Sequence, residues 1–311
     1  MATGGGRVAS GGVECPPVSE ASASTHTQPA FLFSVDLEDV RSMIPDGARY
    51  RERVPANTEK LLAFLARHDR RCTFFTVGDI ARAYPELLRA IAARGHEIAC
   101  HGDAHTPLER LGQAGFLRDL ERSLASFAAA GIPRPVGFRA PVGSLTAATR
   151  WAHGLLREQG FAYSSSVVSA RSPLYGWPEF GGDHPRRVDG LWELPLSLFR
   201  LPGLRIPFAA GVYLRNLPLP LIEGTFRRRT AAGEPIVAYV HPYDIDTDQE
   251  HFMHPELGDS RLLNALMYRN RGDLFRRLDR LFALGARVVP YAEYVATSLG
   301  DGSAGENGRR A

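Results

Sequence analysis

The sequence predicts an α/β protein in which helices cover a parallel sheet. Residues 30–100 alternate between strand-like apolar runs and helical patterns, with mostly short connections. Polar residues that can carry chemistry follow several of the strand-like runs directly. The chain has 311 residues, of which 44% are hydrophobic and 23% are charged, as in ordinary soluble globular proteins. These features favour one large α/β domain and exclude a fibrous or largely disordered chain.

The expected elements follow one another in order. The first strand, Ala30–Val35, is a continuous apolar run, and the next helix carries Leu61, Leu62, Phe64 and Leu65 at helical spacing. Strands are expected at 30–35, 71–77, 97–100, 137–139, 161–163, 192–195, 236–240 and 286–289. Helices are expected at 57–67, 84–94, 116–130, 147–159 and 262–284. Residues 200–220 are interrupted by prolines and receive no assignment.

Composition limits the compartment and the partners. Residues 1–28 are rich in small and polar residues without the apolar run of a signal peptide, so we expect a disordered tail and a cytoplasmic location. Residues 299–311 form a second such tail, and 29–298 the folded domain.

No run approaches the roughly 20 apolar residues of a membrane helix. A net charge of +3 with scattered arginines gives no nucleic-acid footprint, and Cys15, Cys72 and Cys100 form no disulfide framework. The oligomeric state is not predicted.

Functional side chains gather where the predicted strands end. These residues are Asp36, Glu38, Asp39, His101, Arg139 and His241. In parallel α/β sheets and barrels, active sites lie at the carboxyl ends of the strands. This coincidence is the strongest functional signal in the sequence.

The two histidines of His101-Gly-Asp-Ala-His105 indicate a metal site. If His105 lies on the first turn of a helix, both imidazoles can reach one ion. Such a pair alone is more often two surface histidines, but a neighbouring carboxylate completes a set suited to one divalent ion: zinc, cobalt, nickel or iron. A second carboxylate, off the metal, could then act as a general base.

Two further residues have either a chemical or a purely structural interpretation. Arg139 lies in Phe-Arg-Ala-Pro, where a fixed backbone could hold it against the base carboxylate. His241 follows a buried strand and precedes a proline; oriented by an acid such as Asp246, it could protonate a leaving amine.

Six ordered motifs resemble those of the polysaccharide deacetylase family, carbohydrate esterase family 4. They are Ser-Val-Asp-Leu-Glu-Asp, Cys-Thr-Phe-Phe-Thr-Val-Gly, Gly-His-Glu-Ile-Ala-Cys-His-Gly-Asp-Ala-His, Gly-Phe-Arg-Ala-Pro, Trp-Glu-Leu-Pro and Val-His-Pro-Tyr-Asp-Ile-Asp, within residues 30–295. The first motif resembles the branch that opens with Asp-x-Glu-Asp, is associated with exopolysaccharide machinery and carries a C-terminal extension, here 244–290. The resemblance implies a distorted (β/α) barrel, often seven-stranded.

The resemblance also implies an activity, the hydrolysis of N-acetyl groups from amino sugars by a metal-bound water. The implied roles are a general base (Asp36), metal ligands (His101 and His105), an arginine that tethers the base (Arg139), a general acid (His241) and acetyl-pocket residues (Trp192 and Leu194). Because Leu37 separates Asp36 from the acidic pair, either Glu38 or Asp39 could be the third ligand, with a bulge taking up the extra residue.

Two other functions remain open at this stage. A related barrel hydrolase could act on a small-molecule amide or a cyclic ureide. A non-catalytic relative would only bind carbohydrate, although such relatives usually lose the acid or histidine positions, which are present here.

Overall fold

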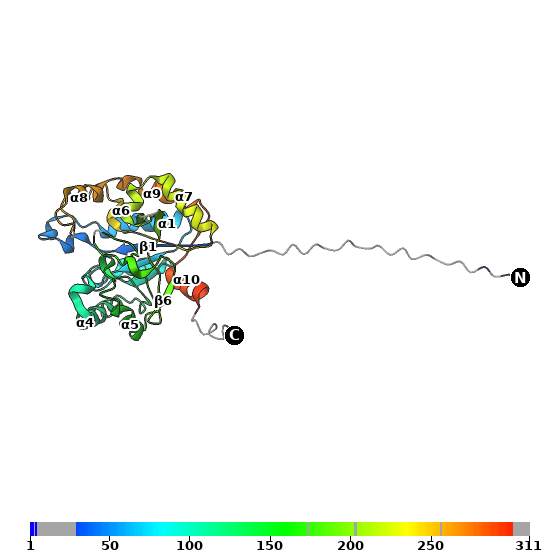
Figure 1. Ribbon diagram of the computed structural model, residues 1–311, viewed down its shortest axis with the longest axis horizontal. Coiled ribbons are helices and arrows are strands. Elements are labelled where there is room, and N and C mark those ends of the chain that lie inside the picture. The colour runs from blue at the N-terminus through cyan, green and yellow to red at the C-terminus, as the bar shows by residue number, and fades with distance from the viewer. Residues whose placement is uncertain (3, 5–28, 173, 202–203, 256, 301–311) are drawn as a thin grey trace.

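A computed structural model describes residues 1–2, 4, 29–172, 174–201, 204–255 and 257–300. The expected tails, 1–28 and 299–311, lie almost entirely outside these residues. The described chain forms one curled sheet with helices around it (Figure 1). Helices α1, α6, α7, α8 and α9 lie on one side of β1, and α4 and α5 lie on the other (Figure 1).

The main sheet has the strand order β10-β1-β2-β3-β4-β5-β7-β6, and β11 also pairs with β1. From β10 to β7 every neighbouring pair is parallel, which makes seven parallel strands among the described residues. The strands are β1 (Ala30–Leu37), β2 (Thr73–Thr76), β3 (Glu97–Cys100), β4 (Gly137–Phe138), β5 (Tyr163–Ser164), β6 (Arg186–Val188), β7 (Leu191–Glu193), β10 (Ile236–Val240) and β11 (Arg287–Val288). The expected parallel α/β fold is confirmed.

The barrel is distorted because β10 and β7 do not pair with each other. The chain after β7 lies beside β10 instead: Val237 N donates to Ser197 Oγ at 2.9 Å, and Tyr239 N donates to the Ala209 carbonyl at 3.1 Å. Between these contacts, β8 (Leu198–Leu201) and β9 (Leu204–Pro207) form an antiparallel hairpin. The proline-interrupted segment that the sequence left unassigned therefore helps to complete the wall.

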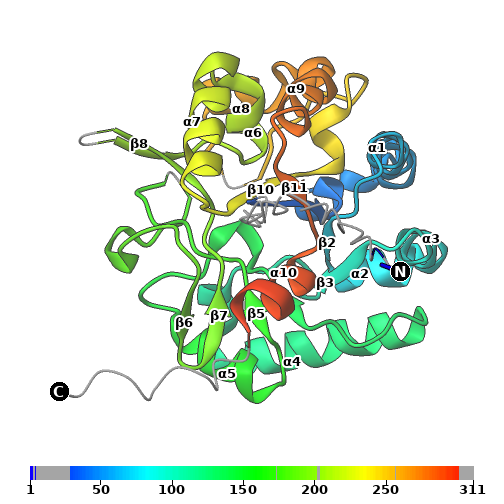
Figure 2. The same cartoon turned by 90° about the vertical axis from the view of Figure 1, so that its right-hand side faces the viewer.

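Helices connect the strands and cover the outside of the sheet (Figure 2). They are α1 (Val54–Arg67), α2 (Gly78–Ala83), α3 (Pro85–Ala93), α4 (Leu108–Ala129), α5 (Trp151–Glu158), α6 (Gly211–Asn216), α7 (Leu219–Ala231), α8 (Arg261–Tyr268), α9 (Leu274–Phe282) and α10 (Tyr291–Tyr294). The expected single helix at 262–284 is two helices. Asn270 has a left-handed φ of 59°, a conformation that asparagine tolerates and that turns the chain between α8 and α9.

Two apolar clusters lie on opposite faces of the sheet. The outer cluster joins alternate β1 residues, including Phe31 and Phe33, to the covering helices. The inner cluster contains Leu32, Phe75 and Tyr291, among others, and fills the barrel. Because side chains alternate along a strand, β1 supplies residues to both clusters. Tyr291 enters the barrel from α10, whose position against the central strands is visible in Figure 2.

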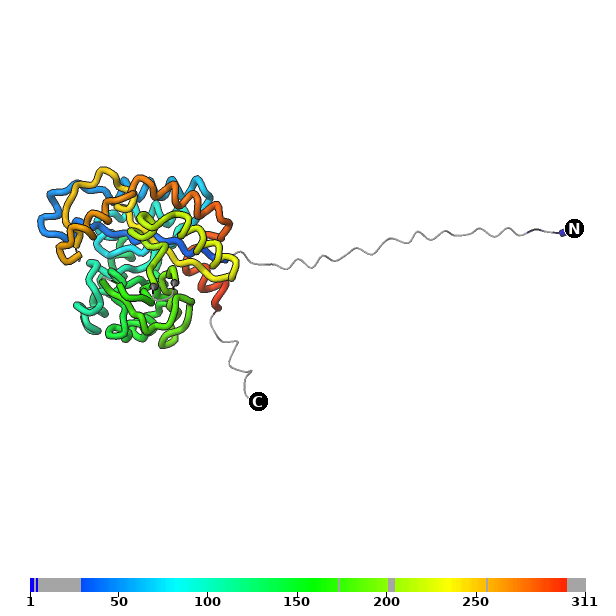
Figure 3. The backbone as a smooth tube through the Cα atoms, turned by 45° about the horizontal axis from the view of Figure 1, so that its top comes forward, coloured from blue at the N-terminus to red at the C-terminus, as the bar shows by residue number. Residues whose placement is uncertain are grey.

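The segment that contains α8 and α9 packs beside the chain that follows β1 (Figure 3). Arg53 Nη1 lies 3.4 Å from Asp246 Oδ1, and Asn57 Nδ2 donates to Asp246 Oδ2 at 2.9 Å. No described helix is both long and apolar enough to cross a bilayer.

Candidate active site

The candidate active site lies at the carboxyl ends of β1, β3, β4 and β10. Asp36 and Glu38 are two residues apart, so both face the same side of β1 and both line the same cavity. Leu37, between them, points to the outer apolar cluster. The β1–β2 register continues unbroken through Leu37. The expected bulge is therefore absent, and strand alternation alone brings the two carboxylates together.

Glu38, His101 and His105 form a buried group of three possible metal ligands. Their ligand atoms lie within 4.8 Å of one another. Oε2 of Glu38 is 2.6 Å from His105 Nε2 and 3.6 Å from His101 Nε2. Burial raises the pKa of Glu38, but the neighbouring His105 and His101 reverse this effect and hold the pKa well below its usual range.

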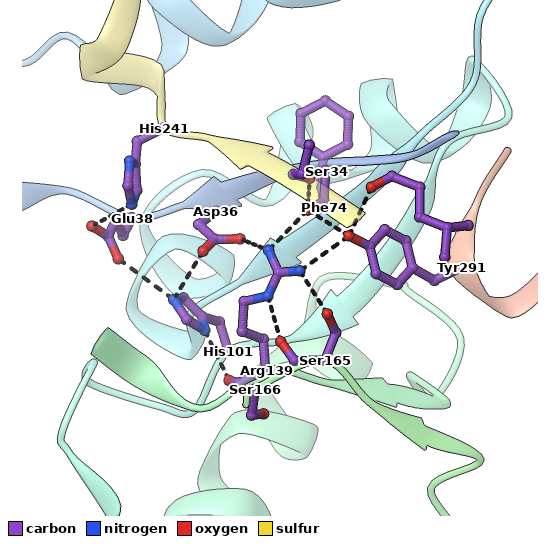
Figure 4. Close-up of polar contacts among 12 residues, drawn as sticks. Ser34, Asp36, Glu38, Phe74, His101, Arg139, Ser165, Ser166, His241 and Tyr291 are labelled. Atoms are coloured by element: carbon purple, nitrogen blue, oxygen red, sulfur yellow. Dashed lines mark hydrogen bonds and ion pairs between the residues drawn. The ribbon is translucent and has the colours of Figure 1, made fainter. Parts of the chain in front are cut away.

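The imidazole of His101 is oriented for coordination. Its Nδ1 lies 2.8 Å from the Arg139 carbonyl. Since a carbonyl only accepts, Nδ1 carries a proton, and Nε2 is the ring nitrogen that faces Glu38. Figure 4 shows this arrangement. His105 reaches the group from a loop with a left-handed φ of 53°, whereas the expected helix begins at Leu108. Two histidines and one carboxylate suit zinc or a similar divalent ion, so these residues fit the expected metal.

Arg139 binds Asp36 inside the barrel (Figure 4). Its Nη1 donates to Asp36 Oδ1 at 2.6 Å and to Ser34 Oγ at 2.8 Å. Its other nitrogens donate to the Ser165 carbonyl, to Ser165 Oγ and to Tyr291 Oη. Burial lowers the pKa of Arg139, but the charge of Asp36 outweighs this and raises it. The guanidinium is thus a fixed charge that keeps Asp36 beside the metal-ligand group, with Asp36 Oδ2 4.0 Å from His101 Nε2.

His241 follows β10 and faces Glu38 (Figure 4), and Asp244 orients its ring. Its Nε2 lies 3.7 Å from Glu38 Oε1, and its Nδ1 lies 3.0 Å from Asp244 Oδ2. Arg215 Nε in turn donates to Asp244 Oδ1 at 2.8 Å. Burial lowers the pKa of His241, but the hydrogen bond to Asp244 and the charge of Glu38 raise it overall.

The acid that contacts His241 differs from the one suggested by the sequence. Asp246 anchors the start of α1 instead, through Arg53 and Asn57. Residues 242–245 form a short 3-10 helix, which brings the side chain of Asp244 back to both the backbone N–H and the ring of His241. The i, i+3 spacing of His241 and Asp244 was the sequence signal that could have identified this pair.

Three other predicted site residues lie elsewhere. Asp39 caps the short helix Val40–Met43 and pairs with Arg41, whose Nη2 lies 2.6 Å from Asp39 Oδ2. It faces away from the histidines because strand alternation places it opposite Glu38. Trp192 donates its indole N–H to the Gly300 carbonyl at 3.2 Å, and Leu194 is buried in the inner cluster. Neither is among the described residues that line the cavity, and their expected place in an acetyl pocket stays a prediction.

A cavity of about 430 Å³ opens over these groups. Its floor holds Asp36, Glu38, Arg139 and His241, and most of the other lining residues are apolar. The volume falls in the range of small-molecule sites, about 300–1,000 Å³.

Two consecutive regions of the chain match known protein families. Residues 43–161 match the family described as polysaccharide deacetylase. Over these residues the chain is similar to the polysaccharide deacetylase family. Residues 165–288 match a second family, described as a domain of unknown function (DUF3473). His101, His105 and Arg139 lie in the first matched region, and His241 lies in the second.

Curated relatives align with part of the chain. A chitooligosaccharide deacetylase from Sinorhizobium fredii is 39% identical over 70 residues, which cover 22% of this chain and 31% of that protein. Chitin deacetylase 1 from Saccharomyces cerevisiae is 29% identical over 132 residues, 42% of each chain. The chain thus spans less than half the length of either relative.

Solved structures share the fold over nearly the whole chain. A candidate polysaccharide deacetylase from Mycobacterium smegmatis superposes with a TM-score of 0.60 and 21% identity, covering 91% of this chain and 94% of that one. The Puue allantoinase gives a TM-score of 0.54 with 15% identity, covering 92% and 99% of the two chains. These similarities establish the barrel fold.

Proposed function

We propose that the protein is a metal-dependent N-deacetylase that hydrolyses the acetamide of an N-acetylated amino sugar. The observation that carries the proposal is the convergence of three groups on one cavity. They are the ligand group of Glu38, His101 and His105, the Asp36–Arg139 pair, and the His241–Asp244 pair. The match to the polysaccharide deacetylase family and the names of the deacetylase relatives support the same chemistry.

The proposed metal site consists of Glu38, His101 and His105. A divalent ion bound there would act as a Lewis acid, polarising the amide carbonyl and lowering the pKa of a water. The carbonyl of Arg139 holds His101 in the ligating tautomer. Zinc is the proposed ion, and the same donor set accepts cobalt, nickel or iron.

Asp36 and His241 are the proposed general base and general acid. Asp36 is held by Arg139 and would accept the proton from the attacking water. His241 carries a raised pKa because burial, which lowers it, is outweighed by Asp244 and Glu38. A raised pKa favours the protonated ring, which would donate from Nε2 to the departing amine. The base, Asp36, and the acid, His241, are thus different residues of one cavity, so each proton transfer of the hydrolysis has its own group.

The proposal is tested by acetate release from N-acetylated chitooligosaccharides. We expect metal-loaded protein to release acetate, and Asp36→Asn to reduce the rate by two or more orders of magnitude while retaining metal. The matched control is Asp279→Asn, since Asp279 is exposed on α9, far along the chain from the site. Equal rates for wild type and Asp36→Asn would contradict the proposed base.

The same assay distinguishes the other functions considered from the sequence. Hydrolysis of a cyclic ureide such as allantoin in place of the amino sugars would assign the site to ureide chemistry. Binding without turnover of either class would indicate a carbohydrate-binding protein. The exopolysaccharide-associated branch, the domain limits and the cytoplasmic location stay predictions.

A further inference from the structure

Helix α8 turns an aliphatic face toward the cavity instead of toward a packed core. Leu263, Leu266 and Met267 follow helical i, i+3, i+4 spacing and all line the cavity. Each is only half-buried, and no residue of α8 is fully buried. A bound apolar group would remove this face from water, which is favourable.

Other aliphatic lining residues come from the same part of the chain, where Tyr213 and Asn216 also line the cavity. Leu174, Val212 and Leu257 line the cavity, and all lie within residues 165–288, the region that matches the domain of unknown function. Among the described lining residues, Arg139 is the only arginine or lysine, and Asp36 already pairs with it. A phosphate or nucleotide group would therefore find no unpaired cationic side chain on this wall. The wall suits an uncharged aliphatic group.

Aromatic contacts connect this wall to His241, the proposed general acid. The ring of Tyr243 stacks on His241 at 4.4 Å, and His254 packs on Tyr243 at 5.4 Å. His254 N then donates to Asn264 Oδ1 of α8 at 2.9 Å. The wall thus begins beyond the proposed general acid. Since that acid protonates the amine, which stays with the sugar, the wall lies on the sugar side of the scissile bond.

We propose that the substrate is an amino sugar carrying an uncharged aliphatic chain on its glycosidic side, and that the α8 wall binds this chain. The wall is defined as Leu174, Val212, Leu257, Leu263, Leu266 and Met267. This inference rests on the proposed deacetylase function, for which it names the substrate class. The segment of unknown function then acts as the part of the active site that selects a glycolipid-like substrate.

The first test measures binding without turnover. The metal-loaded, full-length Asp36→Asn protein is titrated by calorimetry with methyl, hexyl and octyl glycosides of N-acetylglucosamine, below micelle-forming concentrations. Each methylene that is fully buried strengthens binding about fourfold, so we expect the octyl glycoside to bind at least about tenfold more tightly than the methyl glycoside. Equal affinities across the series would overturn the proposal.

A matched pair of variants on α8 shows where the chain binds. Leu266→Asn places an amide in the wall, and we expect it to reduce the octyl-to-methyl affinity ratio at least about threefold. Leu262→Asn makes the same change on the solvent side of the helix, where the leucine is 73% exposed, and should preserve the ratio. An equal loss of the ratio in both variants would show that the chain binds without using the wall.

Three outcomes separate this inference from the proposed function. Acetate release from the wild type at one kcat/KM for every chain length would overturn the inference and leave the deacetylase function standing. A preference for a methyl glycoside of N-octanoylglucosamine over the octyl glycoside would place the chain on the acyl side and also overturn it. Absence of acetate release with a preserved octyl preference in binding would refute the enzyme and retain the chain-binding wall.

Discussion

The Asp36–Arg139 pair gives the sharpest prediction about how the site is held together. Both side chains are about 95% buried and meet at 2.6 Å. Arg139 also donates to Ser34, Ser165 and Tyr291. Replacing Arg139 by Met keeps an unbranched side chain, although a shorter one, and leaves the Asp36 carboxylate buried without its counter-ion. Removing one partner of a buried ion pair costs about 3–5 kcal/mol, and we expect Arg139→Met to lower the unfolding free energy by that amount.

A double-mutant cycle in urea isolates the pair. We expect Asp36→Asn to recover part of the loss when it is combined with Arg139→Met, because the double variant contains no unpaired buried charge. Residues in direct contact couple by about 0.5–3 kcal/mol, and the buried 2.6 Å contact places this pair in the upper half of that range. Arg118→Met, at an exposed position on α4, is the control and should stay within about 0.5 kcal/mol of wild type.

Additive effects in this cycle would refute the reasoning. A coupling free energy below about 0.5 kcal/mol would mean that Arg139 contributes packing rather than charge pairing. Arg139→Lys provides an intermediate case, since lysine keeps the charge but lacks the fork of donors that reaches four partners. It should fold more stably than Arg139→Met and remain less active than wild type.

Three further predictions concern the metal and the proposed acid. Glu38→Gln should abolish stoichiometric zinc in metal analysis while Asp39→Asn retains it, because only the first carboxylate faces the histidines; the reverse result would assign the ligand to Asp39. Asp244→Asn should lower the pKa of His241, because the carboxylate raises it in the wild type against the opposing effect of burial, so the alkaline limb of the kcat/KM profile should move to lower pH. An unchanged limb would exclude His241 as the acid. Gly211→Ala places a Cβ 3.0 Å from Asp244 Oδ2 and 3.4 Å from His241 Nδ1, so kcat/KM should fall about 10–100-fold with unchanged zinc content, and wild-type kinetics would disprove this steric effect.

The protonation of His241 also predicts a contribution to stability that depends on pH. Its pKa is raised in the folded protein, so the stabilisation is fully present below the unfolded value of about 6.5 and is lost as the pH rises through the folded value. The Asp244→Asn variant should lose most of this dependence in urea titrations of metal-free protein between pH 6 and 8.

The sequence by itself determined where most strands lie along the chain and which residue types follow them. Asp36, His101, Arg139 and His241 each follow or end an apolar run, and parallel strands bring such positions to one edge of the sheet. These are local patterns, and the topology of an α/β fold converts them directly into proximity. The convergence of the site was therefore predictable without coordinates.

Only the tertiary structure decided which neighbours these residues have. Glu38 rather than Asp39 faces the histidines because β1 keeps its register to its last residue. Asp244 rather than Asp246 orients His241 because the chain turns in a 3-10 helix. The wall of α8 depends on the break at Asn270 and on contacts between segments far apart in sequence. Such contacts follow from packing and from backbone turns rather than from apolar periodicity, so the sequence pattern alone does not contain them.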